Sequence, residues 1–241
     1  MSSWFEAGHV AIVTGGSKGL GKEIARALLS RGVATIVDGR DAIVLESARS
    51  ELSAYGKVIA IAGDVGEKRH VHALIDAARH LGRLDLLVNN ASTLGETPLP
   101  RIDQLSAETF QRIFDVNVFA PIHLTQHALE VMRRDDRMAT IVNITSDAAV
   151  EAYPTWGGYG ASKAALEHFS RVLAAELDGS SVRVLVADPG DMDTQMHRDA
   201  IPDADPSELR NPADSARALL QAIAGMAHPY ERVRLAELVR A

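Results

Sequence analysis

Short runs of apolar, mostly β-branched or aliphatic residues recur along the chain and predict strands. They cover residues 10–14, 34–38, 57–62, 84–88, 139–145, 182–187 and 232–236. Between them the apolar residues follow helical spacing: Leu20, Ile24 and Leu28 share one face of a helix that Gly32 can close. Longer helices are predicted over 106–134 and 157–177. This alternation is typical of the α/β class and predicts a doubly wound parallel sheet of about seven strands with helices on both faces.

No internal repeat, low-complexity tract or long linker divides the sequence, so we expect a single domain over residues 1–241. One irregular stretch, residues 191–212, is rich in Asp and Pro and precedes a helix that opens near Pro212. Loops of this length often cover binding sites. We therefore expect a substrate lid there, with a plain surface insertion as the alternative.

Composition narrows the classes of partner. A formal charge of -7 gives no electrostatic footprint for nucleic acid or an anionic membrane. The chain has 0 cysteines, which excludes disulfides and thiolate chemistry and fits a reducing cytoplasm. The N-terminus lacks a signal-peptide pattern, and no apolar run approaches the roughly 18 residues of a membrane span. We expect a soluble cytoplasmic protein that acts on a small molecule.

A glycine-rich segment, TGGSKGLG at residues 14–21, follows the first predicted strand directly and opens a helix. Gly15, Gly19 and Gly21 permit a tight turn, close approach of a ligand to the backbone, and close packing of the helix on the sheet. The free amides of the helix N-terminus then face an anion. The spacing is GxxxGxG rather than GxGxxG, and a plain turn is the alternative. Its position after the first strand favours a dinucleotide site.

Polar residues also follow the third and fourth strands. Asp64 lies in GDV and can accept from an adenine amino group, and NNA at residues 89–91 can line the same crevice. Ligands of open α/β sheets bind at the carboxyl ends of the strands, which is where both segments fall. As isolated residues, either would serve as a helix cap or turn former.

The end of the second strand, VDGR, bears on the choice of cofactor. An acidic side chain there favours NAD, whereas arginine accommodates the 2′-phosphate of NADP. Asp38 falls one position before the usual acidic site, which Gly39 occupies, and Arg40 comes next. Lys18 adds a second cation. We predict that NADP(H) is preferred over NAD(H); the alternative is that Lys18 and Arg40 are solvated surface charges.

Tyr159 and Lys163, in YGASK, stand four residues apart and share one helical face, about 6 Å apart along the axis. The ordered motifs of the chain are TGGSKGLG, Asp64, NNA, Asn117 in FDVNV, Ser146 in NITSDAA, YGASK, and Pro189-Gly190 followed by Thr194. In this order the chain resembles the single-domain branch of the short-chain dehydrogenase/reductase family over essentially its whole length. The 13 residues from Ser146 to Tyr159 are typical of that family. The resemblance implies a Rossmann-like NAD(P)-binding fold.

The chemistry explains these residue types. Reduction of a carbonyl needs hydride from the nicotinamide and a proton for the developing alkoxide, which Tyr159 can supply. A tyrosine ordinarily titrates near 10, and we expect the Lys163 ammonium to stabilise its phenolate and to reach the nicotinamide ribose. Ser146 would orient the substrate oxygen, unless it is a turn residue. The resemblance implies that Asn117 completes the catalytic set through a water held by its main chain; a structural role is the alternative.

The resemblance also places Pro189 and Gly190 beside the nicotinamide and assigns the carboxamide contact to Thr194. The predicted cofactor site comprises Gly15, Ser17, Lys18, Gly19, Leu20, Gly21, Arg40, Asp64, Val65, Asn90, Ala91, Tyr159, Lys163, Pro189, Gly190 and Thr194, and no metal is predicted. The chain departs from the family pattern at Ser92, usually glycine, a change that bears on the local backbone and removes no catalytic group. Asp188 and Asp191 also depart from it: they either cap the lid or touch a polar substrate, and we expect capping.

The predicted pocket walls are mostly apolar and favour a neutral carbonyl substrate; they are Thr93, Leu94, Ala148, Val150, Tyr153, Trp156, Met192, Met196 and His197. His197 is expected to be a lid residue rather than an acid or metal ligand. The leading function is an NADP(H)-dependent carbonyl reductase or alcohol dehydrogenase. The alternatives are a nonredox enzyme on the same scaffold and an NADP-binding regulatory protein without turnover. The resemblance implies a homodimer or homotetramer that pairs the long helices.

Overall fold

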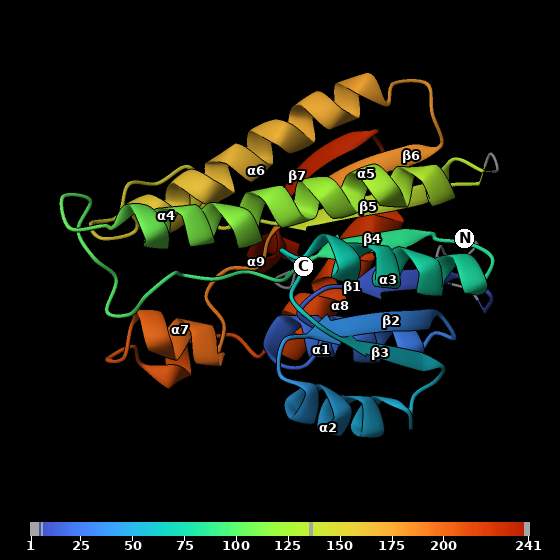
Figure 1. The fold of residues 1–241 in the computed structure, drawn as a ribbon, viewed down its shortest axis with the longest axis horizontal. Helices are drawn as coiled ribbons and strands as arrows, with labels where there is room; N and C mark the ends of the chain where they lie inside the picture. Colours follow the sequence, from blue (N-terminus) through green and yellow to red (C-terminus); the bar gives the residue numbers. More distant parts are fainter. Residues whose placement is uncertain (1–4, 6, 135–136, 239–241) are drawn as a thin grey trace.

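One parallel sheet organises the protein, as the computed structural model of residues 5, 7–134 and 137–238 shows (Figure 1). Its 7 strands run in the order β3-β2-β1-β4-β5-β6-β7. The strands are β1 (Val10–Val13), β2 (Ala34–Gly39), β3 (Val58–Ala62), β4 (Leu86–Asn89), β5 (Ala139–Ile144), β6 (Val182–Asp188) and β7 (Tyr230–Arg234). The predicted fold class, a Rossmann-like doubly wound sheet, is confirmed.

Helices cover both faces of the sheet, and each face has its own apolar core. One core joins the sheet to α1 (Gly19–Leu29), α2 (Ala42–Leu52) and α8 (Pro212–Gly225), and the other joins it to α3 (Lys68–His80), α5 (Ala120–Met132) and α6 (Gly157–Glu176). The remaining α-helices of the described chain are α4 (Ala107–Phe114), α7 (Gln195–Ala200) and α9 (Leu235–Leu238). Because both faces are covered, central strands such as β5 are buried along their whole length, as their mostly apolar sequences predict.

The helix predicted over 106–134 is a composite. Ser106 caps its start, with Oγ accepting from the amide of Thr109 at 3.1 Å. After α4 the backbone widens into a π-helical segment, Asp115–Phe119, before α5 begins. Insertions of this kind are frequent at functional sites. Here the widened turn carries Asn117.

The last strand differs from its prediction. Residues 232–236 were expected, but β7 spans Tyr230–Arg234, and Leu235 begins α9. The reason is pairing: β7 lies at the sheet edge beside β6, and its register matches Tyr230 with Val184 and Arg234 with Asp188, so both strands end together. The apolar Leu235 is then buried in the core under α8 rather than in the sheet.

The segment 191–212 forms a compact excursion rather than an open loop. Two backbone hydrogen bonds close its base, from Asp193 N to Arg210 O at 2.9 Å and from Arg210 N to Asp191 O at 3.1 Å. Between them lie α7 and a short 3-10 turn, Pro206–Glu208. Figure 1 shows α7 standing apart from the helices that cover the sheet. Among the described helices, none is sufficiently long and apolar to cross a membrane.

Strand order fixes where a ligand can enter. The chain leaves β1 towards β2 and β3 on one side and resumes at β4 on the other, so the direction of winding reverses between β1 and β4. Open α/β sheets bind ligands at this switch point, outside the carboxyl ends of the strands. The segments that follow β1, β4, β5 and β6 carry most of the predicted site residues.

Candidate active site

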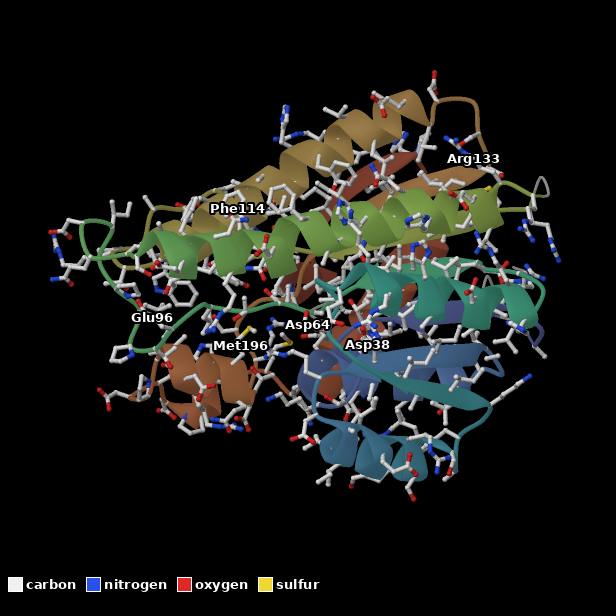
Figure 2. The ribbon with its side chains drawn as sticks, in the orientation of Figure 1. Asp38, Asp64, Glu96, Phe114, Arg133 and Met196 are labelled. Carbon is white, nitrogen blue, oxygen red and sulfur yellow. The ribbon has the colours of Figure 1, made fainter. Side chains whose placement is uncertain are left out.

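The predicted site residues gather towards the edge of the sheet where the strands end. In Figure 2, Asp64 after β3 and Met196 on α7 lie towards this edge, whereas Arg133 lies at the far end of α5. Parallel strands bring their carboxyl ends to one edge, so residues far apart in sequence meet there.

The glycine-rich turn connects β1 to α1 in the geometry that its sequence requires. Gly15 and Gly19 adopt φ angles of 67° and 54°, which favour glycine. A Cβ at Gly21 would collide with the carbonyl oxygen of Gly15. Lys18 stands at the N-cap without a side-chain cap, and the first turn of α1 contains no acidic residue. The amides of this helix terminus are therefore suited to an anion.

The loop after β4 is tied to this turn. Asn90 Nδ2 donates to the carbonyl oxygen of Thr14 at 2.8 Å, and the amides of Asn90 and Ala91 both donate to Thr14 Oγ1 at 3.0 Å. Asn90 and Ala91 thus hold two walls of the predicted crevice together. Asp64 Oδ1 accepts from the amide of Gly66 at 2.8 Å, which is the turn-forming role considered as the alternative for this residue.

The end of β2 holds a buried carboxylate. Asp38 is 1% exposed; its Oδ1 accepts from the amide of Gly15 at 2.6 Å, and its Oδ2 lies 2.9 Å from Nε2 of His70 on α3. Asp38 therefore supports the glycine turn from beneath. Lys18 and Arg40 are both exposed, and neither side chain has a hydrogen-bonding or ionic partner within the described part of the chain.

Tyr159 and Lys163 lie in the first two turns of α6, facing the end of β5. Lys163 is 2% exposed; its Nζ donates to the carbonyl oxygen of Ile144 at 2.9 Å and lies 5.4 Å from the centre of the Tyr159 ring. The small residue Gly160 permits this approach, because a Cβ there would stand 2.5 Å from the carbonyl oxygen of Ala148. The spacing of YGASK thus places both predicted groups against the loop that carries Ser146.

Ser146 ends β5 and caps a short 3-10 turn, Asp147–Ala149. Its Oγ donates to Asp147 Oδ1 at 2.9 Å and accepts from the amide of Ala148 at 3.2 Å. Asp147 Oδ2 in turn accepts from the Tyr153 hydroxyl at 2.9 Å. The predicted catalytic serine therefore stands next to a fixed carboxylate.

Asn117 is fully buried, and its side chain is fully bonded. Oδ1 accepts from the amide of Thr93 at 2.8 Å and from Ser92 Oγ at 3.1 Å, while Nδ2 donates to Thr93 O at 2.9 Å and to Ser162 Oγ at 3.0 Å. Asn117 thus joins the loop after β4 to α6. The predicted role of its main chain remains a prediction.

Burial controls the protonation of the tyrosine and lysine pair. Burial raises the pKa of the Tyr159 phenol well above the ordinary value of 10.0. The charges of Asp188 and Asp147 raise this pKa further, whereas hydrogen bonding with Ser92 and Ser146 lowers it. Burial also lowers the pKa of Lys163 from 10.5 to about 8. We expected the Lys163 ammonium to stabilise the phenolate; in the protein without cofactor, desolvation of the phenol is the largest effect on its pKa.

Ser92 is a site residue that the sequence reasoning missed. It was treated as a backbone variation, yet its hydroxyl reaches both Asn117 and Tyr159. Its replacement of the family glycine was the available signal, because a hydroxyl there adds a polar group beside the predicted acid.

Further predicted cofactor residues lie after β6 and in the segment 191–212. Gly190 has a φ angle of 71°, and the carbonyl oxygen of Pro189 accepts from Ser215 Oγ at 3.2 Å. Thr194 caps α7, with Oγ1 accepting from the amide of His197 at 3.3 Å, and its methyl group lies 3.5 Å from the position of a Cβ at Gly19. The segment 191–212 therefore reaches the glycine turn. The described residues include no cluster suited to a metal ion.

A cavity beside the segment that carries Ser146 differs from the mostly apolar pocket that was expected, whose walls remain a prediction. The cavity measures about 280 Å³ and is lined by Asp147, Glu151, Tyr153, Asp188, Gly190, Asp191, Arg234 and Ala236. Of the nine predicted wall residues, Tyr153 alone lines it. Leu94 and Ala148 instead pack with Tyr159 in a small apolar cluster, against which Trp156 and Met196 are placed. The carboxylates line the cavity because the ends of β5, β6 and β7 meet there.

Comparison with known proteins defines the class. The family model described as short chain dehydrogenase matches residues 9–205, and the chain belongs to that family. It is accordingly an NAD(P)-dependent oxidoreductase.

Individual relatives are reductases. The chain is 36% identical over 215 residues to the rhamnolipids biosynthesis 3-oxoacyl-[acyl-carrier-protein] reductase of Pseudomonas aeruginosa, covering 87% of this chain and 81% of that protein. It is 33% identical over 199 residues to the (S)-benzoin-forming benzil reductase of Saccharomyces cerevisiae, covering 80% and 74%. Among solved structures, the Pseudomonas aeruginosa RhlG/NADP active-site complex has a TM-score of 0.84 at 30% identity and covers 97% of each chain.

Proposed function

We propose that the protein reduces a ketone, aldehyde or diketone to an alcohol, or catalyses the reverse reaction, with NADP(H) and with Tyr159 as the general acid and base. The observation that carries this proposal is the meeting of Tyr159 and Lys163, on α6, with Ser146, after β5, at the same carboxyl edge of the sheet that carries the glycine turn. The benzil and oxoacyl reductases among the relatives support a carbonyl substrate.

The residues present fit a dinucleotide. The start of α1 has no side-chain cap, and the backbone at Gly21 leaves no room for a Cβ. Both features suit a pyrophosphate that binds close to the main chain. Lys18 and Arg40 would hold the 2′-phosphate of NADP(H), since both side chains are exposed and Asp38 is committed to Gly15 and His70. The NADP complex of the structural relative supports the same preference. When bound, the nicotinamide supplies hydride and, once oxidised, a positive charge.

Tyr159 delivers the proton that balances the hydride. Reduction adds two electrons and one hydrogen to the carbonyl carbon as hydride, and the Tyr159 hydroxyl gives its proton to the carbonyl oxygen, leaving an alcohol and a phenolate. Lys163, with a pKa of about 8, is mainly charged at neutral pH and stabilises that phenolate. Because burial raises the pKa of Tyr159, the phenol stays protonated, as an acid must, until the oxygen needs the proton.

Ser146 would orient the substrate. Its hydroxyl interacts with that of Tyr159, so a carbonyl oxygen that bonds one can bond the other. Asn117 would act through the hydrogen bonds that hold Ser92 and Thr93 in place relative to α6.

Further properties belong to the same proposal. We propose that residues 1–241 form one catalytic domain with a lid at about 191–212, and that the protein works in the cytoplasm. We also propose a homodimer or homotetramer, which is supported by the exposed apolar side chains of Phe110, Phe119 and Val172 on the helices expected to pair. Light scattering after size-exclusion chromatography measures the subunit number.

Absorbance at 340 nm tests the reaction, with NADPH and a panel of ketones, aldehydes and diketones, and with NADP⁺ and the corresponding alcohols. Turnover by the wild type is expected to be lost in Tyr159→Phe and kept in the matched control Tyr55→Phe, a substitution at an exposed tyrosine. Turnover that survives Tyr159→Phe would refute the assigned role. NADPH binding without turnover of any panel member would favour a regulatory protein, and conversion of a substrate without a change in absorbance would favour a nonredox enzyme.

A further inference from the structure

The acid-lined cavity lies next to the segment that carries the predicted catalytic residue Ser146. Its walls come from the segments that follow β5, β6 and β7, and Asp147 is adjacent to Ser146 in sequence and bonded to its hydroxyl. A group that enters the cavity therefore lies beside the segment that carries Ser146. At about 280 Å³ it accommodates a small group rather than a long chain.

The cavity is strongly negative. Its lining contains the four carboxylates Asp147, Glu151, Asp188 and Asp191 and a single guanidinium, that of Arg234. Other nearby cations are engaged elsewhere. Arg232 Nε bonds Glu167 Oε2 at 3.0 Å, and Arg210 Nη2 donates to the carbonyl oxygen of Ala236 at 3.0 Å. His197 Nε2 lies 3.4 Å from Asp191 and offsets only that carboxylate, when protonated.

Asp188 is the side chain that points most clearly to a ligand. It is 4% exposed, yet it lines the cavity. Its Oδ1 accepts from the amide of Gly190 at 3.0 Å, which is the capping role expected from sequence, but no residue in the described ranges donates a hydrogen bond to its Oδ2. Burial raises the pKa of this carboxyl group, although Arg232 and Arg234 oppose the shift. The unpartnered oxygen of this largely buried side chain lies on a residue that lines the cavity, where a donor or a cation can complete it.

Asp147 adds a charge that is fixed in position. Both of its oxygens accept hydrogen bonds, from Ser146 Oγ at 2.9 Å and from the Tyr153 hydroxyl at 2.9 Å. Its carboxylate therefore stays beside the serine, where a substrate would meet its field at short range. Glu151 extends the same negative wall towards solvent.

We propose that the physiological substrate carries a cationic nitrogen, such as a protonated amine, close to its reacting carbonyl or carbinol carbon, and that this nitrogen binds between Asp147 and Asp188. This assignment rests on the proposed function and narrows its substrate class. A carboxylate-bearing substrate would meet like charges in the cavity, and a neutral ketone would gain nothing from the field of these carboxylates.

The test uses two ketones of the same shape. One is the 1,1-dimethyl-4-oxopiperidinium ion and the other is 4,4-dimethylcyclohexanone, in which a neutral carbon replaces the cationic nitrogen. A third ketone, 4-oxocyclohexanecarboxylate, carries the opposite charge. With NADPH at low ionic strength, kcat/KM for the cation is expected to exceed that for the neutral ketone by about tenfold or more, with the anion slowest. Added salt should reduce the preference.

Variants then locate the effect. Asp188→Asn, whose amide oxygen can still accept from Gly190, and the exposed Glu151→Gln are each expected to reduce the ratio of cation to neutral kcat/KM several-fold. Asp178→Asn removes the same charge at an exposed site after α6, outside the cavity lining, and should leave the ratio unchanged. Because the readout is a ratio, a general loss of activity in a variant cancels.

Three outcomes would overturn the inference. Equal rates for the cation and the neutral ketone, or a preference unaffected by both cavity variants, would refute the cationic substrate while leaving the carbonyl reductase intact. Failure of every ketone and alcohol in the broader panel would instead remove the proposed function, and this inference with it.

Discussion

Replacement of Lys163 by methionine is expected to stabilise the cofactor-free protein while abolishing its activity. Burial lowers the pKa of Lys163 from 10.5 to about 8, and at about 1.36 kcal/mol per pH unit the charged ammonium costs the folded state about 3 kcal/mol. Methionine has a similar length and no charge, but it loses the hydrogen bond to the Ile144 carbonyl, which contributes about 1 kcal/mol. The net gain at pH 7 is about 2 kcal/mol, or roughly 4 to 8 °C in Tm.

The pH dependence of this gain in stability shows whether it comes from removal of the buried charge or from a change in packing. The pKa of Lys163 is lower in the folded state than in the unfolded state, so below about pH 8 both states are protonated and the wild type carries the full cost. As the pH rises from about 8 towards 10.5, the folded state loses its proton first and the wild type gains stability. The advantage of methionine should therefore shrink over this window.

Urea unfolding at pH 7 and pH 10 measures the gain in the free energy of unfolding and its dependence on pH. Lys57→Met is the matched control, at an exposed lysine. The control should change stability little at either pH. The reasoning is refuted if Lys163→Met is less stable than the wild type at pH 7, or if its advantage is the same at both pH values.

Three further substitutions test the cofactor turn and the acid. Gly21→Ala is expected to raise the Kd for NADPH at least about tenfold in a fluorescence titration, since its Cβ would collide with the Gly15 carbonyl; an unchanged Kd would contradict this. Arg40→Glu should lower kcat/KM for NADPH by about tenfold or more and leave that for NADH nearly unchanged, whereas equal losses would point to misfolding. Ser92→Gly removes a hydroxyl that lowers the pKa of Tyr159, so the acidic limb of the pH profile for alcohol oxidation should move to higher pH; a stationary limb would show that Ser92 does not act on the phenol.

The parts of the fold that were predicted closely depend on local sequence. Most of the strands lie close to the predicted ranges, because buried parallel strands need unbroken apolar runs. The glycine turn was predictable for a similar reason: the positive φ angles at Gly15 and Gly19 are a backbone requirement that the residue type itself reveals. The last strand was misplaced by two residues, since its ends depend on pairing with β6, and the π-helical segment around Asn117 was not anticipated.

What the sequence by itself determined is the class of chemistry: a phosphate-binding turn, and a phenol and an ammonium on one helical face. Tertiary structure alone decided the electrostatics around them. It buried Asp38 against His70, brought the Ser92 hydroxyl to Asn117 and Tyr159, and gathered carboxylates from the ends of β5 and β6 into one cavity beside the end of β7. The physical reason is that backbone conformation depends on neighbours along the chain, whereas desolvation and charge interactions depend on distances in space, which sequence spacing does not reveal.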